Sequence, residues 1–425
     1  MEKLLKIWNY KDLRIKILVT LVLLFLTRVL AHIPLPGVDT VALKSFFEKN
    51  QVFGLLNMFS GGTMENFSII LMGVSPYITS SIIFQLLAMV IPRLEEMQKE
   101  GEAGQQRITQ YTRLLTVPLA IVQAYAMIVL IRNQGIISEF SVGQMATTLT
   151  VVTAGTILLM WLGEIITEKG IGNGVSLIIS IGILAGLPTQ IRNTLSIISS
   201  GDTAGYLKII GVGLIALLVI AAIIFINEGM RKIPVTYARK IRMGQASLKG
   251  VDTFLPIKVN TAGVIPIIFA MSFLIFPGVI AKFLQGAKSQ FLVDFAYALE
   301  RFFNNQLYYG IIYFILVFVF TYFYTSIIFH PDRVAENLQK QGGFIPGLRP
   351  GRETAAYLGR TISRVTFAGG LFLALIAVMP FIFQSVTKIT TLSIGGTGIL
   401  IIVAVIIETY RQILSQLSIH TYDHY

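Results

Sequence analysis

The sequence predicts an all-α integral membrane protein, and its composition and recurring apolar segments are the observations that predict it. Of the 425 residues, 54% are apolar and only 13% are charged, whereas a soluble protein carries about 25% charged residues. Apolar segments close to the length that crosses a bilayer recur along the whole chain. We therefore expect ten transmembrane helices, at residues 15–34, 67–91, 111–131, 146–166, 174–188, 206–227, 261–284, 308–329, 362–384 and 396–416.

The distribution of basic residues predicts the orientation of these helices. If the N-terminus is cytoplasmic, 24 of the 34 Lys and Arg residues fall in cytoplasmic segments and 9 fall on the opposite side. This bias agrees with the positive-inside rule, so we expect both termini in the cytoplasm. The remaining residue, Arg28, lies within the first helix near its outer end. We expect its long side chain to extend to the membrane surface.

One short motif occurs twice and predicts an internal repeat. Residues 73–78 and 263–268 both read G-V-x-P-x-I, in the second and the seventh expected helix. Because five helices separate the two copies, they would run in opposite directions, as in an inverted repeat. A chance match is the alternative, since these residue types are common in membrane helices. We expect two pseudo-symmetric halves, residues 1–200 and 201–425.

The sequence lacks the patterns that catalysis, cofactors and metals require. Cysteine is absent and there are four histidines, none of which belongs to a nucleophile motif. No nucleotide-binding loop or metal-ligand spacing occurs, so we expect no enzyme, no cofactor and no metal site. Glu164, Glu228 and Glu408 fall near cytoplasmic helix ends, whereas ion-coupled transporters place such groups near the midplane. A secondary transporter therefore remains only as the alternative function.

The apolar run at residues 53–59 is too short to cross a membrane. Seven helical residues span about 10 Å, against about 30 Å of hydrocarbon. The run stops at Ser60-Gly61-Gly62, and the next apolar segment starts near residue 67. From the residues alone, a helix lying at the membrane surface is the favoured interpretation.

Several longer stretches, in this order along the chain, carry a resemblance to a known family. Taken together on ten expected helices, they make the sequence similar to the SecY family, which forms the channel of the bacterial protein translocase. The stretches are IPLPGVD (33–39), NMFSGG (57–62), GVSPYITSSIIFQLL (73–87), EGEAGQQRITQYTR (100–113), MWLGEIITEKGIGNGVS (160–176), PIKVNTAGVIPIIFA (256–270) and GGFIPGLRPGRET (342–354).

The resemblance implies a central pore that a short helix plugs and a ring of aliphatic side chains narrows. The plug would occupy about residues 53–64, with Phe53, Leu55, Leu56, Met58 and Phe59 facing the channel and Gly61 and Gly62 acting as a hinge. The ring positions correspond to Val74, Ile78, Ile179, Ile268 and Ile401. Valine at 74 departs from the larger aliphatic residue that is common in the family. Ordinary helix packing is the alternative role for each ring residue.

The family also implies a lateral gate between the second and third helices and the seventh and eighth. Polar groups along that seam would be Thr79, Ser81, Gln85, Asn260 and Thr261. Such groups form interhelical hydrogen bonds of about 1 kcal/mol, which suits a gate that an apolar signal sequence opens. Permanent attachment between helices is the alternative. The function implied is to translocate unfolded secretory polypeptides and to release membrane helices sideways into the lipid.

Two basic cytoplasmic loops, at about 228–260 and 330–364, would dock partners. In the family these are the ribosome and the ATPase SecA, while SecE and SecG are companion subunits. Our candidates for docking are Arg239, Lys240, Arg242 and Arg349, although the positive-inside bias also explains basic loops. SLKGVDTFLP (247–256) departs from the family pattern.

The implied location is the bacterial cytoplasmic membrane. A scaffold or insertase without a pore is a further alternative, which would need neither ring nor plug.

Overall fold

The computed structural model describes residues 10–36, 38, 40–49, 57, 60–133, 135–136, 141–198, 203–237, 251–285, 289–387 and 395–422. Each of the ten segments predicted to span the membrane overlaps a helix. These helices are α2 (Lys11–Ala31), α5 (Ser75–Val90), α7 (Glu102–Asn133), α8 (Val142–Lys169), α9 (Gly174–Ile198), α10 (Thr203–Glu228), α11 (Ile265–Leu284), α13 (Gln306–Ile328), α15 (Arg352–Thr387) and α16 (Gly395–Tyr422).

Only some of these helices are both long and apolar. Within the described ranges, five helical segments are long and apolar enough to cross a membrane, and they correspond to α7, α8, α13, α15 and α16. A sixth span results if α5 and the following α6 (Pro92–Lys99), which are bent by 104° relative to each other, count as one. Shorter apolar stretches lie in α9, α10 and α11.

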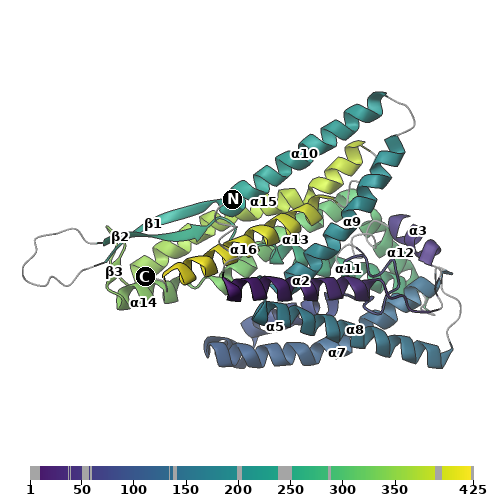
Figure 1. The fold of residues 1–425 in the computed structure, drawn as a ribbon, viewed down its shortest axis with the longest axis horizontal. Coiled ribbons are helices and arrows are strands. Elements are labelled where there is room, and N and C mark those ends of the chain that lie inside the picture. Colours follow the sequence, from purple (N-terminus) through teal and green to yellow (C-terminus); the bar gives the residue numbers. More distant parts are fainter. Residues whose placement is uncertain are drawn as a thin grey trace, which may run out of the picture.

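The helices pack lengthwise into one bundle (Figure 1). In it, α5 packs against α7, α7 against α8, and α8 against α9, while α13 packs against α11 and α15. Contacts of α9 with α16, and of α11 with α5 and α7, join helices that are far apart in sequence. The largest apolar core draws its buried residues from α2, α5, α8, α9, α10, α11, α13, α15 and α16. This core includes Val74, Ile179, Ile268 and Ile401, four of the residues predicted for the pore ring.

Short helices join the long ones at both ends of the bundle. At the end opposite the sheet lie α3 (Thr40–Lys49) and α12 (Gln290–Asn304), the latter between α11 and α13 (Figure 1). At the sheet end, α14 (Pro331–Lys340) packs against α15.

The expectation of an all-α fold with loops at 228–260 and 330–364 is wrong in part, because the structure contains a small antiparallel sheet there. Its strands β1 (Met230–Tyr237), β2 (Val251–Lys258) and β3 (Gly343–Phe344) lie in the order β2-β1-β3. Alternate residues of β1, Ile233 and Val235, are buried and pack with Ile257 against Leu338 and Leu358 of α14 and α15. The sheet is therefore anchored on its own apolar cluster.

The second expected helix also begins later than predicted. We expected it from residue 67, but α5 starts at Ser75. Residues 61–74 instead form a series of turns whose side chains are largely buried, with Met64, Phe67 and Leu71 fully so. Phe67 even adopts a positive φ of 43°. This segment is apolar because it packs inside the protein, so its hydropathy resembled that of a helix.

Candidate functional site

A cavity of about 380 Å³ is lined mainly by residues of α5, α7, α8, α9 and α11. Its polar lining includes Arg113, Glu164 and Asn173, of which Asn173 is exposed and Arg113 is 39% exposed. Its lining also includes the buried or partly buried aliphatic side chains of Ile78, Ile179 and Ile268. From this difference in exposure we infer that the cavity is a vestibule with a polar mouth and an apolar floor.

The structure brings the five predicted ring residues into one apolar cluster. Val74, Ile179, Ile268 and Ile401 are all at least nine-tenths buried, and Ile78 is partly buried and packs against the same cluster. They come from four separate places: the start of α5, α9, α11 and α16. Three of them, Ile78, Ile179 and Ile268, form the apolar floor of the cavity. Val74 and Ile401 belong to the cluster but are not among the residues that line the cavity.

Both copies of the repeated motif have the same local conformation. Gly73 and Gly263 adopt positive φ values of 56° and 66°. In each copy a helix begins two residues later, and its second residue is proline. A proline near a helix start is favourable because the N–H that it lacks would have no helical partner there. The motif therefore encodes a sharp turn into a helix, and it places Ile78 and Ile268 on the first turn of α5 and of α11.

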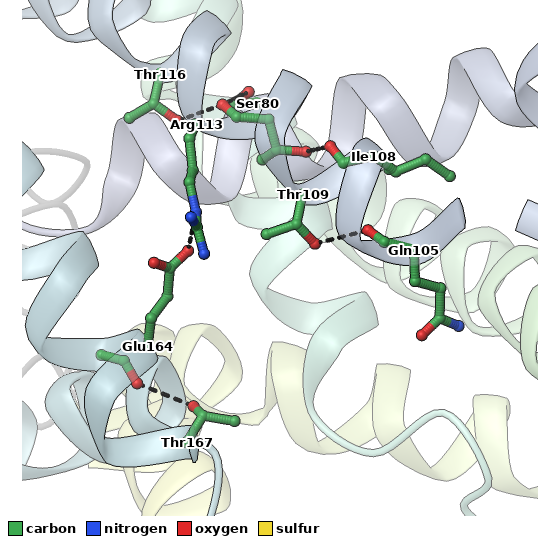
Figure 2. Close-up of polar contacts among 10 residues, drawn as sticks. Ser80, Gln105, Ile108, Thr109, Arg113, Thr116, Glu164 and Thr167 are labelled. Carbon is green, nitrogen blue, oxygen red and sulfur yellow. Dashed lines mark hydrogen bonds and ion pairs between the residues drawn. The ribbon is translucent and has the colours of Figure 1, made fainter. Parts of the chain in front are cut away.

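An ion pair at the mouth of the cavity links two neighbouring helices (Figure 2). Arg113 on α7 donates from Nε to Oε1 of Glu164 on α8 at 2.8 Å. Nearby, Ser80 on α5 donates to the carbonyl of Thr112 on α7 at 2.7 Å. Sequence reasoning missed this pair, although both residues lie in stretches that carry the family resemblance. Their separation of 51 residues gives no local signal of contact.

The predicted plug lies mostly outside the described residues. Phe53, Leu55, Leu56, Met58 and Phe59 are among the residues that the structure does not describe. The predicted hinge is described: Gly61 and Gly62 have φ values of 81° and 76°, which favour glycine. These two residues form a turn that returns the chain toward the buried segment before α5.

The expectation that the side chain of Arg28 extends to the membrane surface is wrong. Its side chain is partly buried, and both Nη1 and Nη2 donate to the carbonyl oxygen of Gly61, each at 3.0 Å. A charged group within a helix that crosses lipid usually pairs with another charge or with backbone carbonyls. This rule predicts that Arg28 has a partner inside the protein, but the sequence could not identify that partner as Gly61.

Three of the predicted gate residues, Thr79, Ser81 and Gln85, lie on α5, which contacts α11, and Ser81 and Gln85 also line the cavity. Thr79 donates to the Ser75 carbonyl of its own helix and accepts from Gln123 of α7. The amide of Gln85 donates to Ser81 on the same helix. On the other side, Asn260 donates to Asn227 at 2.7 Å, and Thr261 donates to the Lys258 carbonyl. None of these bonds joins α5 to α11, so the gate stays a prediction.

Of the predicted docking residues, only Arg349 lies within the described part of the chain. Arg239, Lys240 and Arg242 fall in the undescribed stretch between β1 and β2. Arg349 is exposed on the turn between β3 and α15. Its backbone N–H donates to Glu353 at 3.2 Å and its carbonyl accepts from Thr354 at 2.9 Å. The backbone is thus fixed while the guanidinium remains available to a partner.

Comparison with curated proteins gives close relatives over nearly the whole chain. Protein translocase subunit SecY of Halalkalibacterium halodurans is 44% identical, over 98% of this chain and 97% of the relative. The subunit of the same name from Mycobacterium bovis is 42% identical, over 97% and 96%. These relatives give no support to a secondary transporter.

Solved structures show the same fold at low sequence identity. A structure described as a protein conducting channel has a TM-score of 0.65 and 17% identity, covering 95% of this chain and 92% of its own. Sec61 in the canine ribosome-channel complex has a TM-score of 0.62 at 17% identity, with the same coverage. The SecY family model matches residues 68–410. With most of its length matched in this way, the chain belongs to the SecY family.

Proposed function

We propose that this chain is the protein-conducting channel of a translocase, through which unfolded secretory polypeptides cross the membrane. The observation that carries the proposal is the polar vestibule that ends on Ile78, Ile179 and Ile268. A polar mouth admits a hydrated polypeptide, and the aliphatic floor binds no side chain specifically. Such a floor also resists ions, since a narrow apolar constriction gates by dewetting.

The channel works as a passive conduit rather than as an enzyme, and its partners supply the energy. We propose SecA or the ribosome as the driving partner, SecE as the subunit that clamps the two halves, and SecG as a further companion. A solved relative described as yeast Ssh1 complex bound to the 80S ribosome has a TM-score of 0.58 at 14% identity. Together with the canine complex, it supports a ribosome partner by the likeness of the fold.

The finer architecture is also part of the proposal. Ten membrane-spanning helices form two inverted halves, with both termini in the cytoplasm of a bacterium and the chain in its cytoplasmic membrane. The matching turns at Gly73 and Gly263 support the repeat. In this orientation the sheet of β1, β2 and β3 and the exposed Arg349 face the cytoplasm, where SecA and the ribosome act.

At rest, residues 53–62 plug the pore above the aliphatic ring, and the seam between α5 and α11 opens sideways for signal sequences and membrane helices. The seam suits this role because, among the described residues, the predicted polar groups bond within their own side of it. A seam without strong cross-links opens at low cost when an apolar segment and lipids compete for its surfaces.

Reconstitution tests the proposed function directly. The chain, purified from cells that coexpress a tagged SecE, should retain SecE through size-exclusion chromatography. Proteoliposomes of that complex should then import a preprotein when SecA and ATP are added, as measured by protection from external protease. Retention of SecE without import under these conditions would contradict the channel and favour a scaffold role.

A further inference from the structure

The turn formed by Ser60, Gly61 and Gly62, hereafter the Gly61 turn, lies against two glycines that are near predicted ring residues in the sequence. A Cβ built on Gly182 of α9 would lie only 2.4 Å from the Cα of Gly61, so the two backbones are in direct contact. Gly182 is three residues after Ile179, and residues at this spacing share one face of a helix. A Cβ on Gly73, which precedes Val74, would lie 3.1 Å from the Cα of Ser60. The turn thus fits between Gly182, one helical turn from Ile179, and Gly73, the neighbour of Val74.

One side chain fastens this turn from a third helix. Arg28 on α2 places both Nη1 and Nη2 within 3.0 Å of the single carbonyl oxygen of Gly61. A carbonyl oxygen has two lone pairs and can accept both bonds, and a charged donor makes each of them stronger than a neutral one does. Because the guanidinium is planar and holds its donors in a fixed fork, lysine cannot reproduce this geometry.

The loop that contains the Gly61 turn is closed by hydrogen bonds of its own. Glu65 lies three residues after Gly62. Glu65 is itself held by Asn57, whose side-chain nitrogen donates to Oε2 of Glu65 at 2.9 Å and whose oxygen accepts from the Glu65 backbone N–H at 3.0 Å. Asn57 and Glu65 flank the Gly61 turn on its two sides. The Gly61 carbonyl that Arg28 binds therefore belongs to a loop that Asn57 and Glu65 hold together.

We propose that Arg28 is a positioning residue that holds the Gly61 turn against Gly182 and Gly73, near the aliphatic ring, in the resting channel. This inference rests on the proposed function, because it takes the aliphatic ring to be the constriction of a channel. The assignment of Arg28 itself depends only on the contacts of described residues. Release of the carbonyl would let the turn move away from α9.

The structure offers two independent ways to displace the turn. Arg28→Gln removes the charged fork, while Arg28→Lys keeps the charge without the two-fold contact. Gly182→Ala leaves Arg28 intact but adds a methyl group where the backbone of Gly61 lies, so the turn must move. The matched control is Gly213→Ala on α10, where an added Cβ meets nothing within 4 Å.

The position of the turn can be measured by cysteine labelling, because the native chain has no cysteine. In the full chain with its companion subunit in proteoliposomes, Ser60→Cys is labelled with a membrane-impermeant maleimide present on both sides. We expect Arg28→Gln and Gly182→Ala each to raise the labelling rate about tenfold, the scale of losing a hydrogen bond to a charged group. Arg28→Lys should fall between, and Gly213→Ala should match the parent protein.

Each result bears on the inference. An unchanged labelling rate in Arg28→Gln would overturn it. A labelling rate in Arg28→Lys equal to that of the parent protein would also overturn it, since the charge alone would then suffice. If Arg28→Gln does not assemble, Gly182→Ala decides alone: an increase supports the position of the turn and no change overturns it. Resting ion conductance is measured in parallel. Faster labelling without added conductance would leave Arg28 as the positioning residue and would reject the plug instead.

Discussion

Arg113 and Glu164 form a 2.8 Å ion pair across α7 and α8, at the mouth of the cavity that ends on the aliphatic ring. The side chain of Glu164 is only 16% exposed, whereas that of Arg113 is 39% exposed. The carboxylate therefore depends on its partner more than the guanidinium does. Because Arg113 and Glu164 lie on adjacent helices of the proposed N-terminal half, the pair fixes one wall of the vestibule.

The first prediction concerns this pair. Arg113→Ala should lower the free energy of unfolding by about 1–3 kcal/mol, because a largely buried carboxylate loses its partner. Thermal unfolding of the detergent-solubilised protein measures the effect. The double variant with Glu164→Ala should be less destabilised than the sum of the single variants. Strict additivity would show that the two groups do not stabilise each other.

The second prediction concerns the ring. Replacing Ile78 and Ile268 together by glycine should widen and wet the floor of the cavity, and so increase the resting ion conductance in planar bilayers. The matched control is glycine at Ile311 and Ile315, which are about half exposed on α13 and carry the same helix penalty. Equal conductance in the two double variants would mean that Ile78 and Ile268 do not line the pore.

Sequence reasoning located the helices well because hydropathy over twenty residues reports a strong physical requirement. It failed where apolar residues are buried by other parts of the protein and do not face lipid. Phe67 and Leu71 are apolar because they pack inside turns before α5. The strands were missed because each contains a proline, Pro234 or Pro256, which argues against a strand in a sequence, and because their polar faces resemble a loop. Only alternate residues such as Ile233 and Val235 marked β1.

The candidate site also has features that the sequence could indicate and contacts that it could not. The residues predicted for the ring share one apolar cluster, and two of them, Ile78 and Ile268, lie in a motif that fixes the start of a helix. Their role in a pore stays a prediction. Arg28 with Gly61 and Arg113 with Glu164 could not be paired, because these contacts join residues 33 and 51 positions apart. Distance along the chain carries no information on which carbonyl or carboxylate a cation meets.

The third prediction concerns topology. The excess of basic residues on one side places the segment around Lys249 in the cytoplasm and the segment around Lys388 on the opposite side. Phosphatase fusions, which are active only outside the cytoplasm, should therefore be inactive at Lys249 and active at Lys388. The same activity at both positions would rule out the arrangement of ten spans.

The fourth prediction concerns the exposed arginine between β3 and α15. Arg349→Glu should abolish SecA-driven import while leaving assembly with SecE intact, because the substitution reverses an exposed charge that we propose docks SecA. Arg333→Glu on α14, also exposed at the sheet end, is the control and should retain import. Full import by Arg349→Glu would remove this residue from the docking surface.

The last prediction compares the two motif glycines, which share a backbone conformation but differ in surroundings. Alanine at either position is strained, because a positive φ costs a residue with a Cβ about 1–2 kcal/mol. Around Gly263 there is open space, so this strain should be the whole cost. At Gly73 the new Cβ would also meet Ser60, with its Cα at 3.1 Å and its carbonyl oxygen at 3.2 Å.

Gly73→Ala should therefore lower the thermal midpoint in detergent more than Gly263→Ala does. It should also speed the labelling of Ser60→Cys, because the methyl group pushes the Gly61 turn away from α5, whereas Gly263→Ala leaves that rate unchanged. Both variants should retain SecE, which shows that the bundle still assembles. Equal midpoints with equal labelling rates would mean that Ser60 moves aside without cost, and the contact between the turn and the motif would then not hold the resting state.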